Sequence, residues 1–195
     1  VSSKKTPQTN ARMLQGTAVF LAHNVRDTLN CIGGVQVIFP LLKLLKDQWT
    51  IDYSMCARII SLLTEMLRYN RSNQESMVQE NGFCTLGFIL AQLDPKHINT
   101  STLKALQGML EVASSPRDAI VRDIFIDIFT NFELWIRVEF ETQEKMLLYL
   151  RDEVSRNSDY FREIFGVQYL LDVLRYFFWY KGEKDAIACY NPPNR

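Results

Sequence analysis

Apolar residues recur along most of this chain at the three- and four-residue spacings of helices that bury one face. The clearest example is the segment 35–46, with apolar residues at Val35, Ile38, Leu42 and Leu45. The same pattern predicts long helices over 52–69, 100–113, 116–129, 142–156 and 167–180, and short ones over 25–31, 72–82, 83–93 and 158–165. We find no confident strand, so the sequence predicts an all-α protein.

Polar residues mark where several of these helices are expected to begin. The expected caps are Ser72 in the capping-box sequence SNQE, Asn99 or Thr100, Ser115 followed by Pro116, Thr142, and Ser158. Pro40 is tolerated in the first turn of a helix that starts at about Phe39, and otherwise it predicts a kink. The helix after Thr142 is expected to place on one face Gln143, Leu147, Leu150 and Val154. Residues 131–137, which include Trp135, are expected to form a loop.

A glycine followed by an apolar run occurs three times, at Gly34, Gly82 and Gly166. With these glycines aligned, the following apolar residues coincide as Ile38, Leu86 and Leu170, and as Leu42, Leu90 and Leu174. The spacings of 48 and 84 residues fit a period in the forties, with one diverged unit whose marker falls near Asp123 and Ile124. Such periods are typical of helical arrays, in which a glycine of positive φ turns the chain between helices. The sequence therefore predicts an armadillo/HEAT-like right-handed α-solenoid of about four helical repeats.

Composition narrows the classes of partner. The 195 residues include 22 basic and 22 acidic ones, so the net charge is zero and no basic field attracts nucleic acid or an anionic bilayer. The four cysteines form no CxxC pair, which disfavours a zinc site and a disulfide framework and favours a reducing, cytosolic setting. No apolar run reaches the roughly 20 residues that span a bilayer, so we expect no direct membrane insertion. The chain begins without methionine, and we expect it to be a piece of a longer protein.

The sequence offers little catalytic chemistry. Its histidines are His23 and His97, and the common phosphate-binding, zinc-protease and serine-hydrolase motifs are absent, so we expect no catalytic residues, cofactor or metal. Between residues 111 and 144, eight acidic residues face three arginines, a local charge of about −5. A solvated face is the first interpretation of this cluster, since Asp123 and Asp127 are expected on the outside of a helix without an apolar pocket. The alternatives are an acidic surface for a basic partner and an all-α enzyme that uses paired acids.

Aromatic residues supply further candidates for a protein-contact surface. Five consecutive aromatics from Tyr176 to Tyr180 sweep more than a full helical turn, so some of them must meet a second surface. That surface is either the next repeat or a partner, and in an isolated piece it would favour self-association. The candidate contact residues are Trp135, Asp123, Asp127, Tyr176, Trp179 and Tyr180.

Four segments resemble the armadillo-type α-solenoid region of the neurobeachin family of BEACH-domain proteins. They are VRDTLNCIGGVQVIFPLL at 25–42, PKHINTSTL at 95–103, NFELWIR at 131–137 and LRYFFW at 174–179. The resemblance covers most of 25–180 and implies a large cytosolic scaffold, peripheral on membranes through other domains, that acts in vesicle traffic and membrane-protein sorting. BEACH, PH-like and WD40 modules would lie outside this chain. The family supplies no catalytic residues to these positions.

We therefore interpret residues 25–182 as an armadillo-like solenoid segment, preceded by a lead-in over 1–24 and followed by a polar end over 183–195. Within 1–24, the segment 11–24 fits either a helix or a short strand. The expected function is non-catalytic protein interaction, with unidentified protein partners and with neighbouring repeats of a longer chain. The alternatives are an unrelated armadillo or HEAT adaptor, the enzyme above, and a membrane-surface module, which the neutral charge disfavours.

Overall fold

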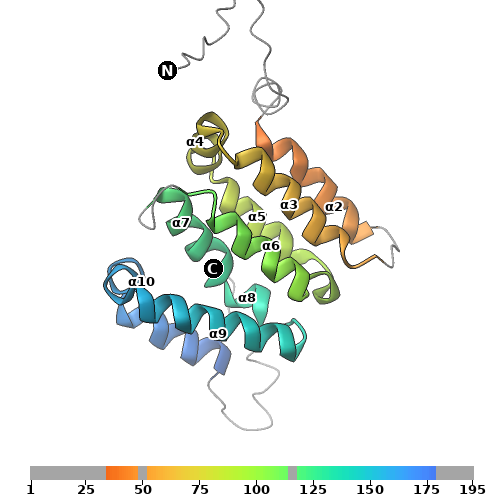
Figure 1. Cartoon of the computed structure of the whole chain (residues 1–195). Coiled ribbons are helices and arrows are strands. Elements are labelled where there is room, and N and C mark those ends of the chain that lie inside the picture. Colours follow the sequence, from red (N-terminus) through yellow and green to blue (C-terminus); the bar gives the residue numbers. More distant parts are fainter. Residues whose placement is uncertain (1–33, 48–51, 114–117, 179–195) are drawn as a thin grey trace, which may run out of the picture.

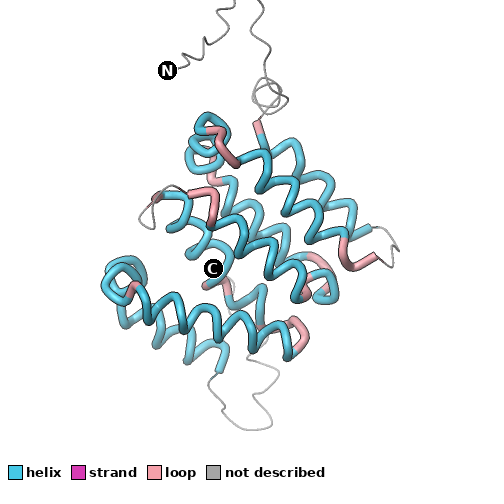
Figure 2. The backbone as a smooth tube through the Cα atoms, in the orientation of Figure 1, coloured by secondary structure: helices cyan, strands magenta, loops and turns pink. Residues whose placement is uncertain are grey.

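The computed structural model describes residues 34–47, 52–113 and 118–178, and every regular element in this part of the chain is a helix (Figure 2). The elements in chain order are η1 (Val35–Ile38), α2 (Phe39–Asp47), α3 (Met55–Leu67), α4 (Arg71–Gln79), α5 (Gly82–Gln92), η2 (Pro95–His97), α6 (Thr100–Leu110), α7 (Ala119–Ile124), η3 (Phe125–Phe129), α8 (Phe132–Trp135), α9 (Phe140–Arg156), α10 (Ser158–Val173) and η4 (Leu174–Phe178). The all-α prediction is confirmed.

The helices lie in two layers (Figure 1). In one layer α3 packs against α6, and α6 against α9. In the other, α2 packs against α5, and α5 against α7 and the π-helix η3 that continues it. Helix α10 extends this second layer, because the rings of Phe125 in η3 and Phe161 in α10 meet edge to face at 4.9 Å. Each helix pair thus covers the apolar flank of the next, as expected for a solenoid.

The order of elements supports the repeat interpretation. One order of elements occurs twice: a long helix, a short helix, a residue with positive φ, and a further helix. The first case is α3, α4, Asn81 and α5. The second is α9, the first half of α10 at 158–165, Gly166, and the second half of α10 at 167–173. The unit between them is divergent, with α6 followed by α7 and η3. Among the described residues, α2 precedes these three units and stands where the last helix of an earlier unit would lie.

The glycine markers have two different physical roles. Gly34 and Gly166 have φ of 72° and 63°, so the prediction of a left-handed turn is confirmed at both. At the second marker it is wrong, because Asn81 makes the turn with φ of 53° and Gly82 is the first helical residue of α5. Gly82 leaves room for a neighbour instead, since an added Cβ would lie 2.5 Å from the sulfur of the buried Met77 and would displace the end of that side chain. By backbone conformation Gly166 is therefore equivalent to Asn81 and not to Gly82, one residue away from the alignment made on the glycines.

Asparagine side chains cap α4 and α6. The side chain of Asn70 accepts a hydrogen bond from the N–H of Asn73, so α4 begins one residue before the predicted cap Ser72. The cap at Asn99 is confirmed, with its Oδ1 accepting from two backbone N–H groups at 3.0 and 3.1 Å. These side chains satisfy backbone donors that the first turn leaves without a partner.

Two later helices start elsewhere than predicted. Helix α7 begins at Ala119 after Asp118, whose carboxylate accepts from the N–H of Ile120, while the predicted cap Ser115 lies outside the described residues. The marker expected near Asp123 and Ile124 is wrong, because those positions lie inside the helix. Helix α10 begins at Ser158 itself, with Asn157 in the capping position.

Helix α9 buries a different face from the predicted one. It begins at Phe140, so Thr142 is not a cap but a side chain that is 1% exposed. Met146 is also fully buried, while Leu147 and Val154 are each 37% exposed. The buried stripe is thus displaced by one residue, because α9 turns the face of Thr142 and Met146 towards the core.

The predicted stripes on α2 and α5 are confirmed. All of the residues named for them are at most 6% exposed: Val35, Ile38, Leu42 and Leu45 for η1 and α2, and Phe83, Leu86, Ile89, Leu90 and Leu93 for α5 and its end. Pro40 lies in the first turn of α2 after the 3-10 turn η1, where its missing N–H removes no helical hydrogen bond. Within the described ranges, every helix is too short or too polar to cross a bilayer.

Candidate functional site

Trp135 lies in the core and not on a contact surface. The residues around it form the short helix α8 in place of the predicted loop, and its side chain is 0% exposed. Its ring stacks on Phe129 with centroids 6.4 Å apart and planes inclined by 11°. Its indole N–H donates to the carbonyl oxygen of Ile128 at 2.8 Å. The polar neighbours that suggested a loop lie on the outer side of a single helical turn.

The hydrogen bond from Trp135 belongs to a set that closes the end of the π-helix η3. The hydroxyl of Thr130 donates to the carbonyls of Phe125 at 2.9 Å and Ile126 at 3.1 Å. The Tyr169 hydroxyl of α10 donates to the carbonyl of Thr130 at 2.7 Å. A helix end leaves carbonyl oxygens without N–H donors, and here side chains from α8 and α10 supply the donors. The Tyr169 bond thereby joins α10 to the end of η3.

Asp123 and Asp127 are half-buried, and they differ in environment. Asp123 accepts two hydrogen bonds from the guanidinium of Arg122, at 3.0 and 2.9 Å. Burial is the main cause that raises the pKa of Asp127, followed by repulsion from Asp123, while a hydrogen bond with Cys84 lowers it. The expectation that no environment raises a pKa here is wrong for Asp127, because α5 packs against η3 and removes water from this side chain. A role for either carboxylate in partner binding stays a prediction.

The described part of the chain contains no group of three or more histidine, cysteine or acidic side chains that could hold a metal ion. His97 is 3% exposed, and its ring meets Tyr53 edge to face at 5.1 Å. Its backbone carbonyl, not its ring, accepts the hydroxyl of Thr102 at 2.7 Å. His97 thus packs as a core side chain, and His23 lies outside the described residues.

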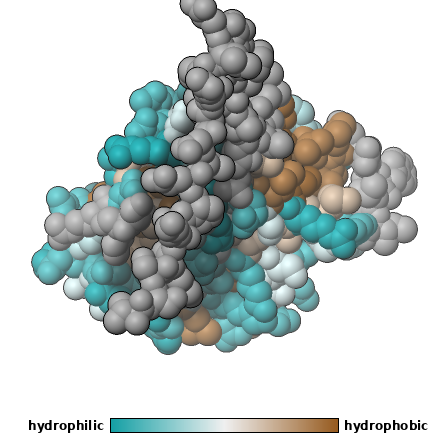
Figure 3. Space-filling view, turned by 45° about the horizontal axis from the view of Figure 1, so that its top comes forward, coloured by the Kyte–Doolittle hydropathy of each residue, from teal (hydrophilic) through white to brown (hydrophobic). Residues whose placement is uncertain are grey.

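Apolar side chains are exposed on both end helices. On η1 and α2, Val37, Leu41 and Leu44 are 42%, 43% and 48% exposed, and Figure 3 shows brown, apolar atoms gathered over this part of the molecule. At the other end, Tyr176 and Phe178 are 46% and 44% exposed.

The aromatic run is divided between core and surface, as its helical sweep predicts. The rings of Phe177 and Phe178 pack against the ring of Phe132, with centroid distances of 6.0 and 5.9 Å. Trp179 and Tyr180 lie outside the described residues. The exposed part of the run adjoins other exposed apolar residues of the last helix: Val167, Leu170, Leu171 and Leu174.

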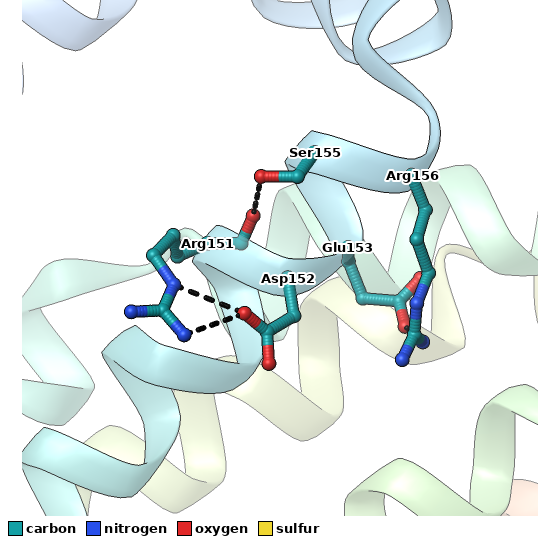
Figure 4. Close-up of polar contacts among 5 residues, drawn as sticks. All are labelled: Arg151, Asp152, Glu153, Ser155 and Arg156. Atoms are coloured by element: carbon teal, nitrogen blue, oxygen red, sulfur yellow. Dashed lines mark hydrogen bonds and ion pairs between the residues drawn. The ribbon is translucent and has the colours of Figure 1, made fainter.

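The outer end of α9 carries paired charges that the sequence did not single out (Figure 4). Arg151 donates to the carboxylate of Asp152 at 2.8 and 3.0 Å, and Arg156 donates to Glu153 at 2.7 Å. Figure 4 shows the Glu153–Arg156 pair on a different side of the helix from the Arg151–Asp152 pair. Exposed pairs of this kind contribute at most about 1 kcal/mol to stability.

A cleft of about 410 Å³ lies between α6, α7, α9 and α10, beside this end of α9. Its walls include the apolar side chains of Leu110, Val121 and Phe125, together with Tyr149 and Glu153. Burial raises the pKa of the Tyr149 phenol far above its usual value, and the charge of Glu153 is the second cause. The lining residues come from segments far apart in the sequence, so only Glu111, as a member of the acidic cluster, had a sequence signal.

Comparison with known proteins identifies the family. A family model described as Neurobeachin/BDCP, DUF4704 alpha solenoid region matches residues 3–191. BEACH domain-containing protein B of Arabidopsis thaliana is 25% identical over 182 residues, which cover 87% of this chain and 7% of that protein. The putative neurobeachin homolog of Caenorhabditis elegans is 24% identical over the same shares of both chains. BEACH domain-containing protein lvsD of Dictyostelium discoideum is 27% identical over 145 residues, 66% of this chain and 5% of that protein.

No solved structure matches the chain significantly. The chain spans 7% of the length of the first two of these relatives. The family match covers nearly all of its residues and agrees with the stacked helical units, which confirms the resemblance found in the sequence. This chain therefore belongs to the family of neurobeachin/BDCP α-solenoid regions.

Proposed function

We propose that this chain is a non-catalytic scaffold segment of a BEACH-domain protein. Its helical units stack on neighbouring units of a longer polypeptide and present surfaces to partner proteins. In this proposal the whole protein acts in the cytoplasm, in vesicle traffic and in the sorting of membrane proteins. The small share of the relatives' length that this chain covers, 7%, supports a role as one part of a larger assembly of domains.

An exposed apolar face on α10 and η4 carries the proposal. Counted from the left-handed residues Asn81 and Gly166, three positions of the last unit are equivalent to three in α5. In α5 and its end, Leu86, Ile89 and Leu93 are 0%, 4% and 5% exposed. The equivalent Leu171, Leu174 and Phe178 are 53%, 53% and 44% exposed.

The same apolar positions are therefore covered in an inner unit and exposed in the last described one. Covering the remaining half of each side chain would stabilise the array by about 1 kcal/mol per residue. A following helical unit of the same polypeptide would cover this face as neighbouring units of a solenoid cover one another. The isolated segment would instead associate with itself through this face at high concentration.

A double substitution tests the stacking. In the longer natural protein, Leu171→Glu with Leu174→Glu should accelerate hydrogen exchange of the α10 amides, because the following unit can no longer pack on this face. In the 195-residue chain the same pair should change the free energy of unfolding by less than about 0.5 kcal/mol per site, because both side chains already contact water.

The matched control is Phe140→Glu, at an equally apolar residue that is 76% exposed at the start of α9. It should leave the exchange of α10 unchanged in both proteins. Unchanged exchange in the longer protein with the double substitution would contradict the stacking proposal.

The role in sorting needs a cellular measurement. Cells whose BEACH-domain protein carries Leu171→Glu and Leu174→Glu should show altered surface amounts of membrane proteins relative to cells with the Phe140→Glu control. Equal surface amounts in the two lines, at equal protein abundance, would argue against a scaffold role for this segment.

A further inference from the structure

The cleft between α6, α7, α9 and α10 combines an apolar interior with an acidic rim. Val121, Phe125 and Phe161 are buried at 7%, 3% and 6% exposure, and they form the inner wall. The volume of about 410 Å³ lies within the range of roughly 300–1,000 Å³ typical of ligand pockets. The cleft can therefore accept one long side chain together with a neighbouring apolar group.

Two carboxylates line the cleft from opposite helices. Glu111 follows the end of α6 and is exposed, and among the described residues it has no ion-pair partner. Glu153 projects from α9 and is only 18% exposed, with Arg156 as its partner. The Arg156 side chain is 69% exposed, so the pair lies partly in water and an incoming cation can replace Arg156 at little cost.

Aromatic rings complete a setting that suits a guanidinium group. Tyr149 and Tyr160 line the cleft together with the two phenylalanines of its wall. Arginine stacks its planar group on such rings and pairs with carboxylates through two parallel hydrogen bonds, whereas the rim carboxylates repel phosphate and other anions.

We propose that this cleft binds an arginine side chain of a partner protein. The aliphatic stem packs on Leu110 and Val121, and the guanidinium meets Tyr149, Glu111 and Glu153 at the rim. The inference deepens the proposed scaffold function, because it names the chemistry by which one surface of the segment would recognise a partner.

A pair of peptides tests the chemistry on the 195-residue chain with labelled methyl groups. The probe is acetyl-Leu-Arg-Leu-amide, and its control carries citrulline, which has nearly the shape of arginine but no charge. The arginine peptide should shift the NMR signals of the Leu110 and Val121 methyl groups saturably, and the citrulline peptide should bind at least about 5-fold more weakly.

Two substitutions test the residues. Glu111→Gln and Glu153→Gln should each weaken binding of the arginine peptide about 2- to 5-fold. Glu144→Gln removes the same charge from an exposed position of α9 outside the cleft and should leave the affinity unchanged. Arg156→Gln should strengthen binding, because it removes the group that competes for Glu153.

Several results would overturn the proposal. Equal binding of the two peptides would reduce the site to an apolar cleft, and an equal loss in Glu144→Gln would reduce it to unspecific attraction. Methyl shifts away from the cleft, or no saturable shift at millimolar peptide, would remove the site. None of these results bears on the stacking face of α10, whose test uses hydrogen exchange in the longer protein, so the two proposals fail separately.

Discussion

Replacing Trp135 by phenylalanine tests whether this side chain stabilises the core or serves a partner. The change removes the indole donor from the carbonyl oxygen of Ile128, which keeps the N–H of Asn131 at 3.3 Å, so the loss of this hydrogen bond costs about 0.5–1.5 kcal/mol. The smaller ring also leaves a void beside Phe129, which adds about 1 kcal/mol. The free energy of unfolding should therefore fall by about 1.5–2.5 kcal/mol, which lowers Tm by about 3–10 °C in a chain of 195 residues.

Urea unfolding followed by far-UV circular dichroism measures this effect without depending on tryptophan fluorescence. The control is Phe140→Leu, at a side chain that is 76% exposed, which should change stability by less than about 0.5 kcal/mol. If Trp135→Phe is as stable as the unsubstituted chain, the hydrogen bond and the stacking do not stabilise the fold as described. A contact residue would instead lose partner binding at unchanged stability.

Three further predictions concern the described helices. Gly87→Ala should destabilise the chain by about 1–3 kcal/mol, because its Cβ would collide with the carbonyl oxygen of Asp127. Gly108→Ala should stabilise the chain by about 0.5–1 kcal/mol, because nothing lies within 4 Å of the added Cβ. Urea unfolding of both variants measures the difference. Asn99→Ala should cost about 1 kcal/mol through loss of the α6 cap in the same assay, and an unchanged midpoint would contradict the capping role. Because the pKa of Asp127 is raised, the folded chain binds a proton on this carboxylate more tightly than the unfolded chain does. The stability that this proton contributes to the folded chain is fully present below pH about 4 and is lost as the pH rises through the folded pKa. Asp127→Asn should therefore stabilise the chain at pH 7 relative to its effect below pH 4, and unfolding curves at both pH values check the sign.

Local signals explain why much of the fold was predictable. The stripe on α5 has helical spacing and both ends marked, by Asn81 with Gly82 and by Leu93 with Pro95, so its face needed no knowledge of neighbours. The same holds for the cap at Asn99, which involves residues three positions apart or fewer. Periodicity and capping depend on atoms within one or two turns, and a sequence displays them directly.

Helix α9 and Trp135 show where local signals end. Helix α9 has apolar residues on two adjacent faces, and the neighbouring helices decided that Met146 is buried while Leu147 remains 37% exposed. Helix α8 has only four residues, which is too few to show a repeating pattern of apolar positions. Its sequence therefore gave no indication that Trp135 points inward.

The sequence by itself determined the helical class, the apolar stripes of α2 and α5 and the cap at Asn99, because these follow from contacts between residues close in the chain. Only the tertiary structure decided that η3 lies against Gly87, that burial raises the pKa of Asp127, and that Glu111 and Glu153 share one cleft. These features join helices up to about one repeat apart, and their geometry depends on how neighbouring units stack.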